Sequence, residues 1–399
     1  MSELLKRTWA KINLDDIEHN YRLVRNHVAP SVLIMCIVKA DAYGHGVRHI
    51  SLLHQELGAD WFGVSNLEEA LQIREIGIFK PVLILGYTPP NRASDLSKYC
   101  FTQSVFSEEY AQELSACAKE ANCTIDCHIK FDSGMTRLGL SCRTKEQIER
   151  AADAAERICA LPNLKCTGAF THFSVADEGE SQREFTYSQY DKFSGVLTLL
   201  EERGIKLKLR HCCNSAATLE YSQFHMDMVR PGIILYGLKP SGEFKDKYDL
   251  RPAMEIKSVI SMIKQVEEGA FASYGRTYEF RQPSVVATIP IGYADGYPRL
   301  LSSSGEVTQD MLVQGKRAPV VGRVCMDQLL LDVSRIENVR AGMTVTVFGR
   351  DKEAFIPVDE LSEKAGTINY ETVCLVGKRV PRTYQRNGKT VAQVNYIID

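Results

Sequence analysis

The sequence predicts an α/β fold in which an N-terminal (β/α)8 barrel of the TIM type is followed by a mostly-β C-terminal domain. Two observations predict it. From residue 31 to residue 229, short apolar segments alternate with amphipathic helical segments, which is typical of parallel strands connected by helices. Beyond residue 249, strand-like segments follow one another with turns between them. A chain of 399 residues is long enough for two domains of this kind.

The barrel strands are predicted from short apolar runs bounded by turn residues. These runs are Ser31–Val38, Trp61–Ser65, Pro81–Tyr87, Phe101–Phe106, Thr124–Phe131, Leu164–Phe173, Lys206–Cys213 and His225–Val229. Of the helices between them, Leu67–Ile76 is the clearest, since Asn66 is a good N-cap, Glu69 stands in the capping-box position and Gly77 ends the segment. A second helix is predicted from Lys145 to about Cys159. The alternative, a doubly wound open sheet, normally carries a GxGxxG turn, which this chain lacks.

The N-terminal segment and the second half complete the predicted architecture. Thr8–Leu14 reads as a strand, and Asp15 or Asp16 then caps a helix. The apolar stripe of that helix is Ile17, Tyr21, Val24 and Val28. The polar segment Gly242–Tyr248 is predicted to be a linker. The later strands are Met254–Ile263, Val285–Ile291, Val320–Val324, Leu329–Val333 and Met343–Phe348, and only Val358–Ala365 looks helical.

Composition excludes several classes of function. The net charge of −2 and the absence of a long basic block argue against nucleic acid and anionic membranes as partners. No apolar run approaches the roughly 20 residues that span a bilayer, and the N-terminus has no apolar signal region, so we expect a cytoplasmic protein. The 12 cysteines are scattered without metal-ligand spacing, and adjacent Cys212 and Cys213 fit small buried thiols. No metal site is expected.

The segment Val38–Gly46, VKADAYGHG, follows the first barrel strand and carries the strongest chemical signal. A lysine at the end of a buried strand is positioned to have a lowered pKa and to form a Schiff base, which makes Lys39 a candidate. Gly44 and Gly46 would allow backbone N–H groups or the Tyr43 hydroxyl to approach a phosphate. A single lysine after a strand is more often a solvated surface residue, so the assignment depends on what surrounds it.

Other polar residues follow the later strands, on the same predicted rim. Arg137 lies in the loop Asp132–Gly139, His172 ends the sixth strand, and Arg230 follows the eighth. His211 is near the end of the seventh strand, before Ser215. Taken singly, the histidines fit hydrogen-bonded core residues, the arginines fit ion pairs and Ser215 fits a helix cap. Together on one rim they favour a phosphate-bearing cofactor with a Schiff-base lysine.

Several strings resemble signatures of the bacterial alanine racemases, and the resemblance covers nearly the whole chain. They are Val38–Gly46, Met228–Gly237 (MVRPGIILYG), Ser273–Tyr278 (SYGRTY), Ile291–Arg299 (IGYADGYPR), Gly322–Gln328 (GRVCMDQ) and Ile368–Glu371 (INYE). The resemblance implies a pyridoxal 5'-phosphate enzyme that interconverts L- and D-alanine, supplying D-alanine for peptidoglycan. It also implies that segment 1–14 packs with the β-domain, that residues 15–242 form the barrel and that residues 249–399 form the β-domain.

The resemblance implies a role for each matching residue. Lys39 is the cofactor lysine and one base, and Tyr274 is the second base, oriented by His172. Arg230 binds the pyridine nitrogen. Arg137 and the backbone N–H of Met326 hold the substrate carboxylate, and Lys130 matches a lysine that is carbamylated in some members. The phosphate-binding set is Tyr43, Ser215, Gly232, Ile233 and Tyr370, and the entrance or support residues are Tyr293, Arg299 and Asp327.

Two alternatives stay open from the sequence. A basic-amino-acid decarboxylase shares the barrel and β-domain, although its lysine motif lacks the DAYGHG continuation. A broader alanine/serine racemase is the other, since a small pocket rejects an added hydroxyl only weakly. The family resemblance further implies a homodimer in which each barrel mouth is covered by the partner's β-domain, so that active sites are shared.

Overall fold

The computed structural model describes residues 6–244, 247–303 and 308–398, which form two compact units. The barrel unit consists of Ile17–Ala42 and Val47–Arg251. The β-unit consists of residues 6–16, the short segment Tyr43–Gly46 and the described residues from Pro252 onward. Within the predicted linker, residues 245 and 246 lie outside the described residues, as do residues 1–5 of the N-terminal segment.

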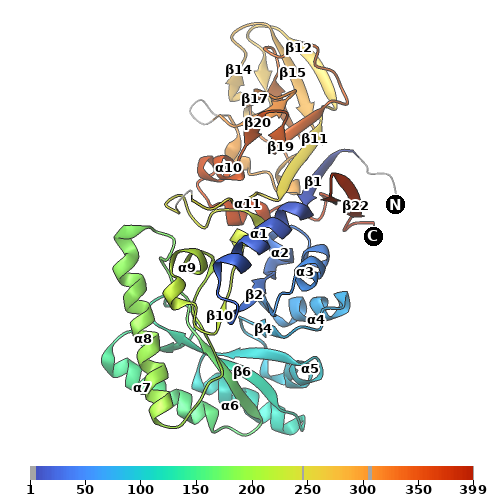
Figure 1. Ribbon diagram of the computed structural model, residues 1–399. Coiled ribbons are helices and arrows are strands. Elements are labelled where there is room, and N and C mark those ends of the chain that lie inside the picture. Colours follow the sequence, from blue (N-terminus) through green and yellow to red (C-terminus); the bar gives the residue numbers. More distant parts are fainter. Residues whose placement is uncertain (1–5, 245–246, 304–307, 399) are drawn as a thin grey trace. The chain divides into compact units, whose positions relative to one another are not determined.

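The barrel unit is built on a sheet of parallel strands, as predicted (Figure 1). In chain order these are β2 (Leu33–Ile37), β3 (Trp61–Val64), β4 (Val82–Ile84), β5 (Phe101–Val105), β6 (Ile125–Asp132), β8 (Leu164–Phe170), β9 (Leu209–His211) and β10 (Met228–Val229), and the two-residue β7 (Leu140–Ser141) pairs with β6. The sheet runs from β10 through β2 to β9. Backbone bonds from Asp227 N–H to Arg210 O (3.1 Å) and from Arg230 N–H to Cys213 O (3.0 Å) then join the two ends. The predicted barrel is therefore confirmed.

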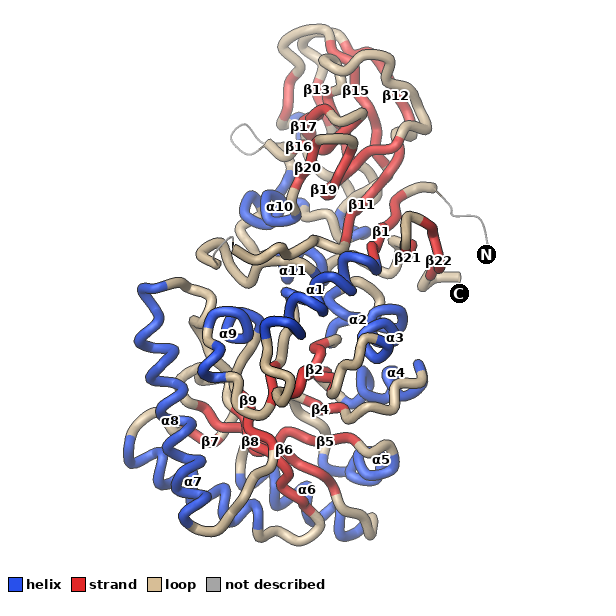
Figure 2. Tube along the Cα trace, viewed as in Figure 1, coloured by secondary structure: helices blue, strands red, loops and turns tan. Residues whose placement is uncertain are grey.

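Helices cover the outside of this sheet, and Figure 2 shows α7 and α8 side by side. The helices are α1 (Leu14–His27), α2 (Lys39–Tyr43), α3 (Val47–Glu56), α4 (Leu67–Ile76), α5 (Ala93–Lys98), α6 (Glu108–Glu120), α7 (Lys145–Cys159), α8 (Arg183–Glu202) and α9 (Ser215–Glu220). The bounds predicted for α4 and α7 are confirmed, and Asn66 caps α4 by accepting the Glu69 N–H at 3.0 Å. Helix α1 begins before the predicted caps Asp15 and Asp16, because the Asn13 side chain already accepts the Asp15 N–H.

Several barrel strands are shorter than the apolar runs that predict them. The run Lys206–Cys213 contains only the three residues of β9, because β9 pairs with β8 at three positions, Leu209 to His211. Within the run His225–Val229, only the two residues of β10 form a strand, and a 3-10 turn over Ser222–Phe224 precedes the run. Apolar side chains before and after each ladder are buried at the barrel ends without forming strand.

The β-unit is dominated by one large sheet with the strand order β12-β15-β18-β17-β16-β19-β11-β1-β21-β22, in which β1 lies between an antiparallel and a parallel neighbour. Its strands are β1 (Thr8–Asn13), β11 (Met254–Val259), β12 (Met262–Val266), β15 (Ser284–Ile289), β16 (Asp310–Val313), β17 (Lys316–Val321), β18 (Leu329–Asp332), β19 (Thr344–Asp351), β21 (Arg382–Arg386) and β22 (Lys389–Val394). Strand β20 (Ala354–Ile356) pairs with β19, and β13 (Phe271–Ala272) pairs with β14 (Tyr278–Glu279).

The β-unit contains six strands that the sequence analysis did not predict, β13, β14, β16, β20, β21 and β22, and it departs from the stated predictions in three further places. The predicted strand Met254–Ile263 divides into β11 and the start of β12, and the predicted strand Val320–Val324 covers only the end of β17. The prediction of a single helix was wrong, because α11 (Asn369–Cys374) follows α10 (Val358–Lys364). With six residues, α11 is too short to show a helical period in the sequence.

The described part of the chain contains neither a membrane-spanning helix nor a candidate metal site. No helix there is long and apolar enough to cross a membrane. Among the same residues, no group of three or more His, Cys, Asp or Glu side chains is arranged to hold a metal ion.

Candidate active site

Lys39 follows β2 by two residues and opens a turn of left-handed helix, the most unusual backbone in the chain. Ala40, Asp41 and Ala42 have φ of 52–53° and ψ of 46–52°, and Tyr43 has a φ of 53°. Non-glycine residues usually adopt this left-handed conformation one at a time, because each residue in it costs about 1–2 kcal/mol. The sequence did not predict this turn, and backbone strain of this kind collects at functional sites.

Hydrogen bonds from other segments of the barrel unit hold the left-handed turn. The Glu69 carboxylate accepts the N–H of Ala40 at 2.7 Å and the N–H of Ser65 at 2.7 Å. Asp41 accepts the N–H of Val47 at 2.8 Å. The Glu69 carboxylate therefore fixes the backbone immediately after Lys39, and it bonds to Ser65 and Ala40 in place of the Asn66 N–H that the predicted capping box requires. Sequence reasoning assigned Glu69 to the cap alone.

Gly44 and Gly46 have a role different from the predicted one. Both have positive φ, and both lie against other parts of the β-unit. A Cβ on Gly44 would lie 2.1 Å from the Val373 carbonyl oxygen, and one on Gly46 would lie 1.8 Å from the Tyr384 hydroxyl. Close packing against α11 and β21 therefore requires glycine at both positions. The sequence analysis had assigned these glycines a different role, the close approach of a phosphate.

Tyr43 and Tyr370, two members of the predicted phosphate-binding set, come together within the β-unit. Their ring centroids are 6.1 Å apart and the rings are tilted by 53°. Tyr43 is buried, and Tyr370, on α11, is half-buried. A segment from the barrel's first loop and a helix from the end of the chain thereby bring two phenol groups close to each other.

The other predicted phosphate-binding residues meet within the barrel unit. Ser215 is the first residue of α9, and Ile233 is the first residue of a 3-10 turn that ends at Tyr236. The Gly232 N–H donates to the Ser215 hydroxyl oxygen at 2.8 Å, which joins the two turns. The first N–H groups of a helical turn have no partner within it. Two adjoining N-terminal turns and a hydroxyl are a donor set that fits a phosphate.

Arg230 is buried, with 3% of its surface exposed, and its guanidinium is held from several sides. Nη2 donates to the carbonyl oxygens of Thr171 (2.8 Å) and Cys212 (3.2 Å). Nη1 donates to Nδ1 of His211 at 2.8 Å, and Nδ1 of His172 lies 3.4 Å from Nη2. Burial lowers the pKa of Arg230 to about 10, so the group keeps its charge at neutral pH. A buried, charged donor of this kind fits a ring nitrogen that accepts a hydrogen bond.

His172 is the point on which the barrel's positive charges converge. Burial lowers its pKa well below the usual value, and the charges of Lys130, Arg230, Arg137 and Lys39 lower it further, in that order. These four cations come from separate parts of the barrel wall and its loops. The structure therefore brings the barrel members of the predicted site together around one neutral imidazole.

Lys130 has only 8% of its surface exposed, and burial, followed by Arg230 and Arg137, lowers its pKa well below the usual value. Its amine lies 4.5 Å from the centre of the Phe170 ring. A lowered pKa favours the neutral, nucleophilic form of a lysine amine. This is the form that combines with carbon dioxide.

Arg137 lies on an exposed loop that is anchored to the end of β6. The Asp132 carboxylate accepts the N–H groups of Gly134 (3.1 Å) and Thr136 (2.9 Å). Gly139 returns the chain to the strand, since a Cβ there would lie 2.8 Å from the Asp132 backbone nitrogen. The loop thus has a fixed base while the Arg137 side chain stays exposed to a substrate.

In the β-unit, Tyr274 lies on a strained turn between β13 and β14. Ser273 has a φ of 60°, Gly275 of 73° and Arg276 of 50°. The Ser273 hydroxyl donates to the Arg323 carbonyl oxygen at 2.6 Å, and the Arg276 guanidinium stacks 3.9 Å above the Phe271 ring. This turn leaves 69% of the Tyr274 surface exposed. The phenol is therefore presented outward by a backbone that is itself fixed.

Met326, Asp327 and Tyr293 gather on two loops that are bonded to each other. The N–H of Tyr293 donates to Cys325 O at 3.2 Å, and the N–H of Ala294 donates to Met326 O at 3.0 Å. Arg379 then bridges Asp327 (2.7 Å) and the buried Asp295 (3.4 Å). Arg299 is exposed, and no described side chain or backbone group bonds to its guanidinium.

Asp295 is a residue that sequence reasoning missed. Its carboxylate is fully buried, forms an ion pair with Arg7 at 2.5 Å and accepts the Gly292 N–H at 3.1 Å. The IGYADGYPR string contains it, but nothing in the string shows that its partner is Arg7, almost 290 positions away. Only the fold shows that Asp295 connects Arg7, next to strand β1, with the loop that carries Tyr293.

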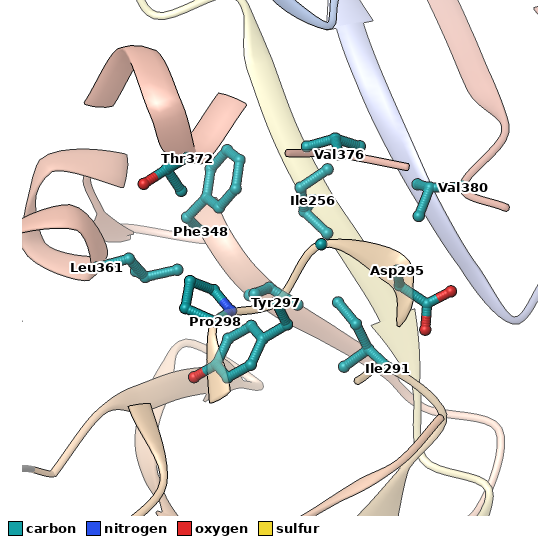
Figure 3. A pocket seen from close by; sticks show the side chains of 12 residues that line it. Ile256, Ile291, Asp295, Tyr297, Pro298, Phe348, Leu361, Thr372, Val376 and Val380 are labelled. Atoms are coloured by element: carbon teal, nitrogen blue, oxygen red, sulfur yellow. The ribbon is translucent and has the colours of Figure 1, made fainter. Parts of the chain in front are cut away.

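Two cavities of the described residues lie apart from the predicted site residues. One in the β-unit, of about 20 Å³, is lined mainly by apolar side chains such as Ile256, Phe348 and Leu361 (Figure 3). It has room for about one water molecule. Another, of about 210 Å³, lies in the barrel unit between Arg183, Glu220 and Phe244. None of the predicted site residues lines either cavity.

The fold and the barrel site define the class of protein. A (β/α)8 barrel carries its active site on the loops after its strands, and here those loops hold a lysine, an anion-binding pair of helical turns and a buried arginine. Together with the β-domain, this is the architecture of a barrel enzyme.

Comparison with known proteins identifies the family. The family profile described as "Alanine racemase, N-terminal domain" matches residues 12–240, and "Alanine racemase, C-terminal domain" matches residues 253–384. An alanine racemase from Desulfovibrio desulfuricans is 44% identical over 378 residues, covering 94% of this chain and 97% of the relative. The chain belongs to the alanine racemase family.

Solved structures agree. Alanine racemase from Bacillus anthracis with bound L-Ala-P has a TM-score of 0.91 and 36% identity, and covers 99% of each chain. Alanine racemase from Bartonella henselae with covalently bound pyridoxal phosphate has a TM-score of 0.82 and 26% identity, and covers 95% of this chain and 99% of the other. The chain is therefore an amino-acid isomerase that interconverts L- and D-alanine. This decides against the decarboxylase alternative.

Proposed function

We propose that this chain racemises alanine with pyridoxal 5'-phosphate held on Lys39, and that Lys39 and Tyr274 are the two bases. The observation that carries the proposal is the convergence on His172, where the charges of Lys39, Lys130, Arg137 and Arg230 all act on one imidazole. Two lysines and two arginines that act on one histidine, together with the bonds of Arg230 to His211 and its approach to His172, support a common site at one end of the barrel. The relative with covalently bound pyridoxal phosphate supports the choice of cofactor.

The residues present fit this cofactor. Ser215, Gly232 and Ile233 would bind the phosphate from the barrel unit, and Arg230 would donate to the pyridine nitrogen. Tyr43 and Tyr370 are the phosphate-binding candidates of the β-unit. When bound, the cofactor stabilises negative charge at the substrate's α-carbon. A charged arginine opposite the ring nitrogen keeps that nitrogen unprotonated, which limits side reactions such as transamination.

Racemisation removes the α-proton from one face and returns a proton to the other, so it requires two groups that exchange protons. Lys39 would serve the face of D-alanine and Tyr274 the face of L-alanine. His172 would orient the tyrosine hydroxyl. Arg137 and the Met326 N–H would hold the substrate carboxylate, while Tyr293, Arg299 and Asp327 would form the entrance.

Lys130 is the proposed site of a carbamate. The neutral amine would combine with carbon dioxide and release a proton, and the carbamate's negative charge would lie near Arg137 and Arg230, the two cations that lower the pKa of the free amine. A carbamate there would form a charge-assisted hydrogen bond with Arg137 and hold its guanidinium toward the substrate carboxylate.

We further propose a homodimer with shared active sites, in which the exposed Tyr274, Met326 and Tyr293 of one chain cover the barrel of the other. Their exposed surface fractions are 69%, 52% and 43%, which is high for functional groups that act away from water. The proposed location is the cytoplasm, where the product D-alanine would be supplied for peptidoglycan.

The experiment that tests the cofactor assignment is reduction with borohydride followed by peptide mapping. We expect the pyridoxyl label on the peptide that contains Lys39. Lys130 is the matched internal control, because it is a buried lysine of the same unit and its pKa is lowered. Label on Lys130, or on a surface lysine, would overturn the assignment. A Lys39→Arg variant should take up no label while it keeps its charge.

A further inference from the structure

The barrel interior contains two buried histidines, His128 and His211, that the proposed chemistry does not use. His128 and His211 are both fully buried, on strands β6 and β9. Nδ1 of His128 lies 2.9 Å from Nε2 of His211, and Nδ1 of His211 in turn lies 2.8 Å from Nη1 of Arg230. Arg230, His211 and His128 thus form a continuous chain of hydrogen bonds inside the barrel.

The direction of this chain follows from the chemistry of its members. A guanidinium has only donors, so Nδ1 of His211 accepts in the bond to Arg230. A neutral imidazole has one protonated nitrogen, so the hydrogen of His211 is on Nε2. That N–H can donate only to an unprotonated Nδ1 of His128, and the hydrogen of His128 is then on Nε2. The bond to Arg230 and the bond to His128 thus each favour the same tautomer of His211.

Both rings are held neutral, as this assignment requires. Burial, followed by the charge of Arg230, lowers the pKa of His128 to about 3. Burial, Arg230 and His128 lower the pKa of His211 well below the usual value. Two imidazolium rings beside a buried guanidinium would also remove the acceptor that His211 offers to Nη1 of the arginine.

The packing around His128 keeps its ring in place. Trp61 lies beside it with ring centroids 5.4 Å apart, and Phe170 stacks on His211 at 4.9 Å. A Cβ on Gly168 would lie 2.7 Å from Nε2 of His128, so the glycine provides the space for that edge of the ring. No described group bonds to Nε2 of His128.

We propose that His128 is a positioning residue for Arg230: by accepting the His211 Nε2–H, it holds His211 in the tautomer whose Nδ1 accepts from the guanidinium. If His211 took the other tautomer, its Nδ1–H would face Nη1–H of Arg230, and two donors would repel. The guanidinium would then leave the orientation in which Nη2 bonds to Thr171 and Cys212. The consequence for catalysis depends on the proposed role of Arg230, while the tautomer assignment does not.

The test measures tautomers directly in the holoenzyme labelled with ¹⁵N-histidine. Two-bond ¹H–¹⁵N spectra distinguish a protonated from an unprotonated ring nitrogen, and His211 is assigned by the loss of its signals in His211→Asn. In the native sequence we expect Nδ1 of both His128 and His211 to be unprotonated and Nε2 of both to carry hydrogen. A protonated Nδ1 on His211 would overturn the proposal, whatever the reaction.

The variants separate positioning from packing. His128→Leu removes the acceptor, so we expect a smaller fraction of His211 in the Nε2–H tautomer. We also expect kcat to fall about tenfold, the effect of roughly one hydrogen bond, while KM changes little. His128→Asn keeps an oxygen acceptor near the Nδ1 position and should restore both readouts. His54→Leu is the matched control, since His54 is equally buried with a pKa lowered to about 3 and has no bonded partner among the described residues.

Each outcome decides the question. An unchanged His211 tautomer in His128→Leu would overturn the proposal, as would equal losses in His128→Leu and His54→Leu. If His128→Leu does not fold, the native tautomers and the His128→Asn variant still decide it. A shifted tautomer with unchanged kcat would keep the positioning role and contradict the proposed role of Arg230 in the reaction.

Discussion

The two units contribute to the proposed site in opposite ways. In the barrel unit the groups at the centre of the proposed site are buried and bonded: Arg230 has 3% of its surface exposed, and His211 bonds to it from the barrel interior. In the β-unit the proposed second base and the residues near it are exposed, and Tyr274 has 69% of its surface accessible. The barrel supplies a fixed charge arrangement, while the β-unit supplies side chains presented from a fixed backbone.

This difference shows which parts of the proposed chemistry a single chain can complete. Burial acts on the protonation states in the barrel, because it lowers the pKa of His172 and of Lys130 and so favours their neutral forms, while Arg230, with a pKa of about 10, keeps its charge at neutral pH. An exposed phenol such as Tyr274 lacks such surroundings within its own unit. The β-unit residues therefore need a second surface over them before they can act in a water-excluded site.

The largest effect is expected for the second base. Tyr274→Phe removes the hydroxyl and leaves the strained turn at Ser273 intact, so folding should be unchanged. General acid–base catalysis contributes about 10²–10⁴-fold. We expect α-proton exchange from L-alanine to fall by about that factor and exchange from D-alanine to fall far less. Solvent deuterium exchange on each enantiomer measures this, and equal losses would count against two bases on opposite faces.

A smaller effect is expected at the buried Lys130. Removing carbon dioxide should raise the KM for alanine about tenfold, since one charge-assisted hydrogen bond to Arg137 is worth about 1.5–3 kcal/mol. Added bicarbonate should restore it. Lys130→Ala should show the raised KM at every bicarbonate concentration. A native enzyme that does not respond to bicarbonate, with no mass increase on Lys130, would exclude the carbamate.

As the pH falls, the barrel unit should lose stability at a higher pH than the β-unit. The folded-state pKa values of His54 and His128, about 3, lie below the unfolded value of about 6.5. The unfolded chain therefore binds protons that the folded barrel does not. Stability is full above about pH 6.5 and falls by about 1.4 kcal/mol per pH unit for each such histidine as the pH drops toward 3.

The two tryptophans report on this separately, because Trp61 lies in β3 of the barrel unit and Trp9 in β1 of the β-unit. In single-tryptophan variants, acid should change the Trp61 fluorescence at a higher pH than the Trp9 fluorescence. His54→Leu should move the Trp61 transition to lower pH. A β-unit that responds first would contradict the account of the buried histidines.

The same contrast explains what the sequence predicts well. Apolar runs such as Trp61–Ser65 and caps such as Asn66 are local signals, so the barrel strands and helix α4 follow from them. Lys39 was found because a strand end and a specific string coincide. The family resemblance, rather than periodicity, singled out Tyr274 and Met326.

What sequence reasoning missed is non-local. The left-handed turn after Lys39 depends on Glu69, 29 positions from Ala40. His128 acts through His211, 83 positions away, and the partner of Asp295 is Arg7. The energy of each such contact depends on burial that only the assembled fold creates, so no pattern within a segment can show it.

The most direct test of the central claim, that the barrel and β-domain of one site come from different chains, is complementation. Lys39→Ala and Tyr274→Ala should each be nearly inactive. After mixing, partial denaturation and refolding, half of the dimers should be mixed, and in each of these one site carries both changes and the other neither. Activity should therefore return to roughly a quarter of the native value. No recovery, with mixed dimers confirmed by native mass spectrometry, would show that one chain supplies both bases and would contradict the account.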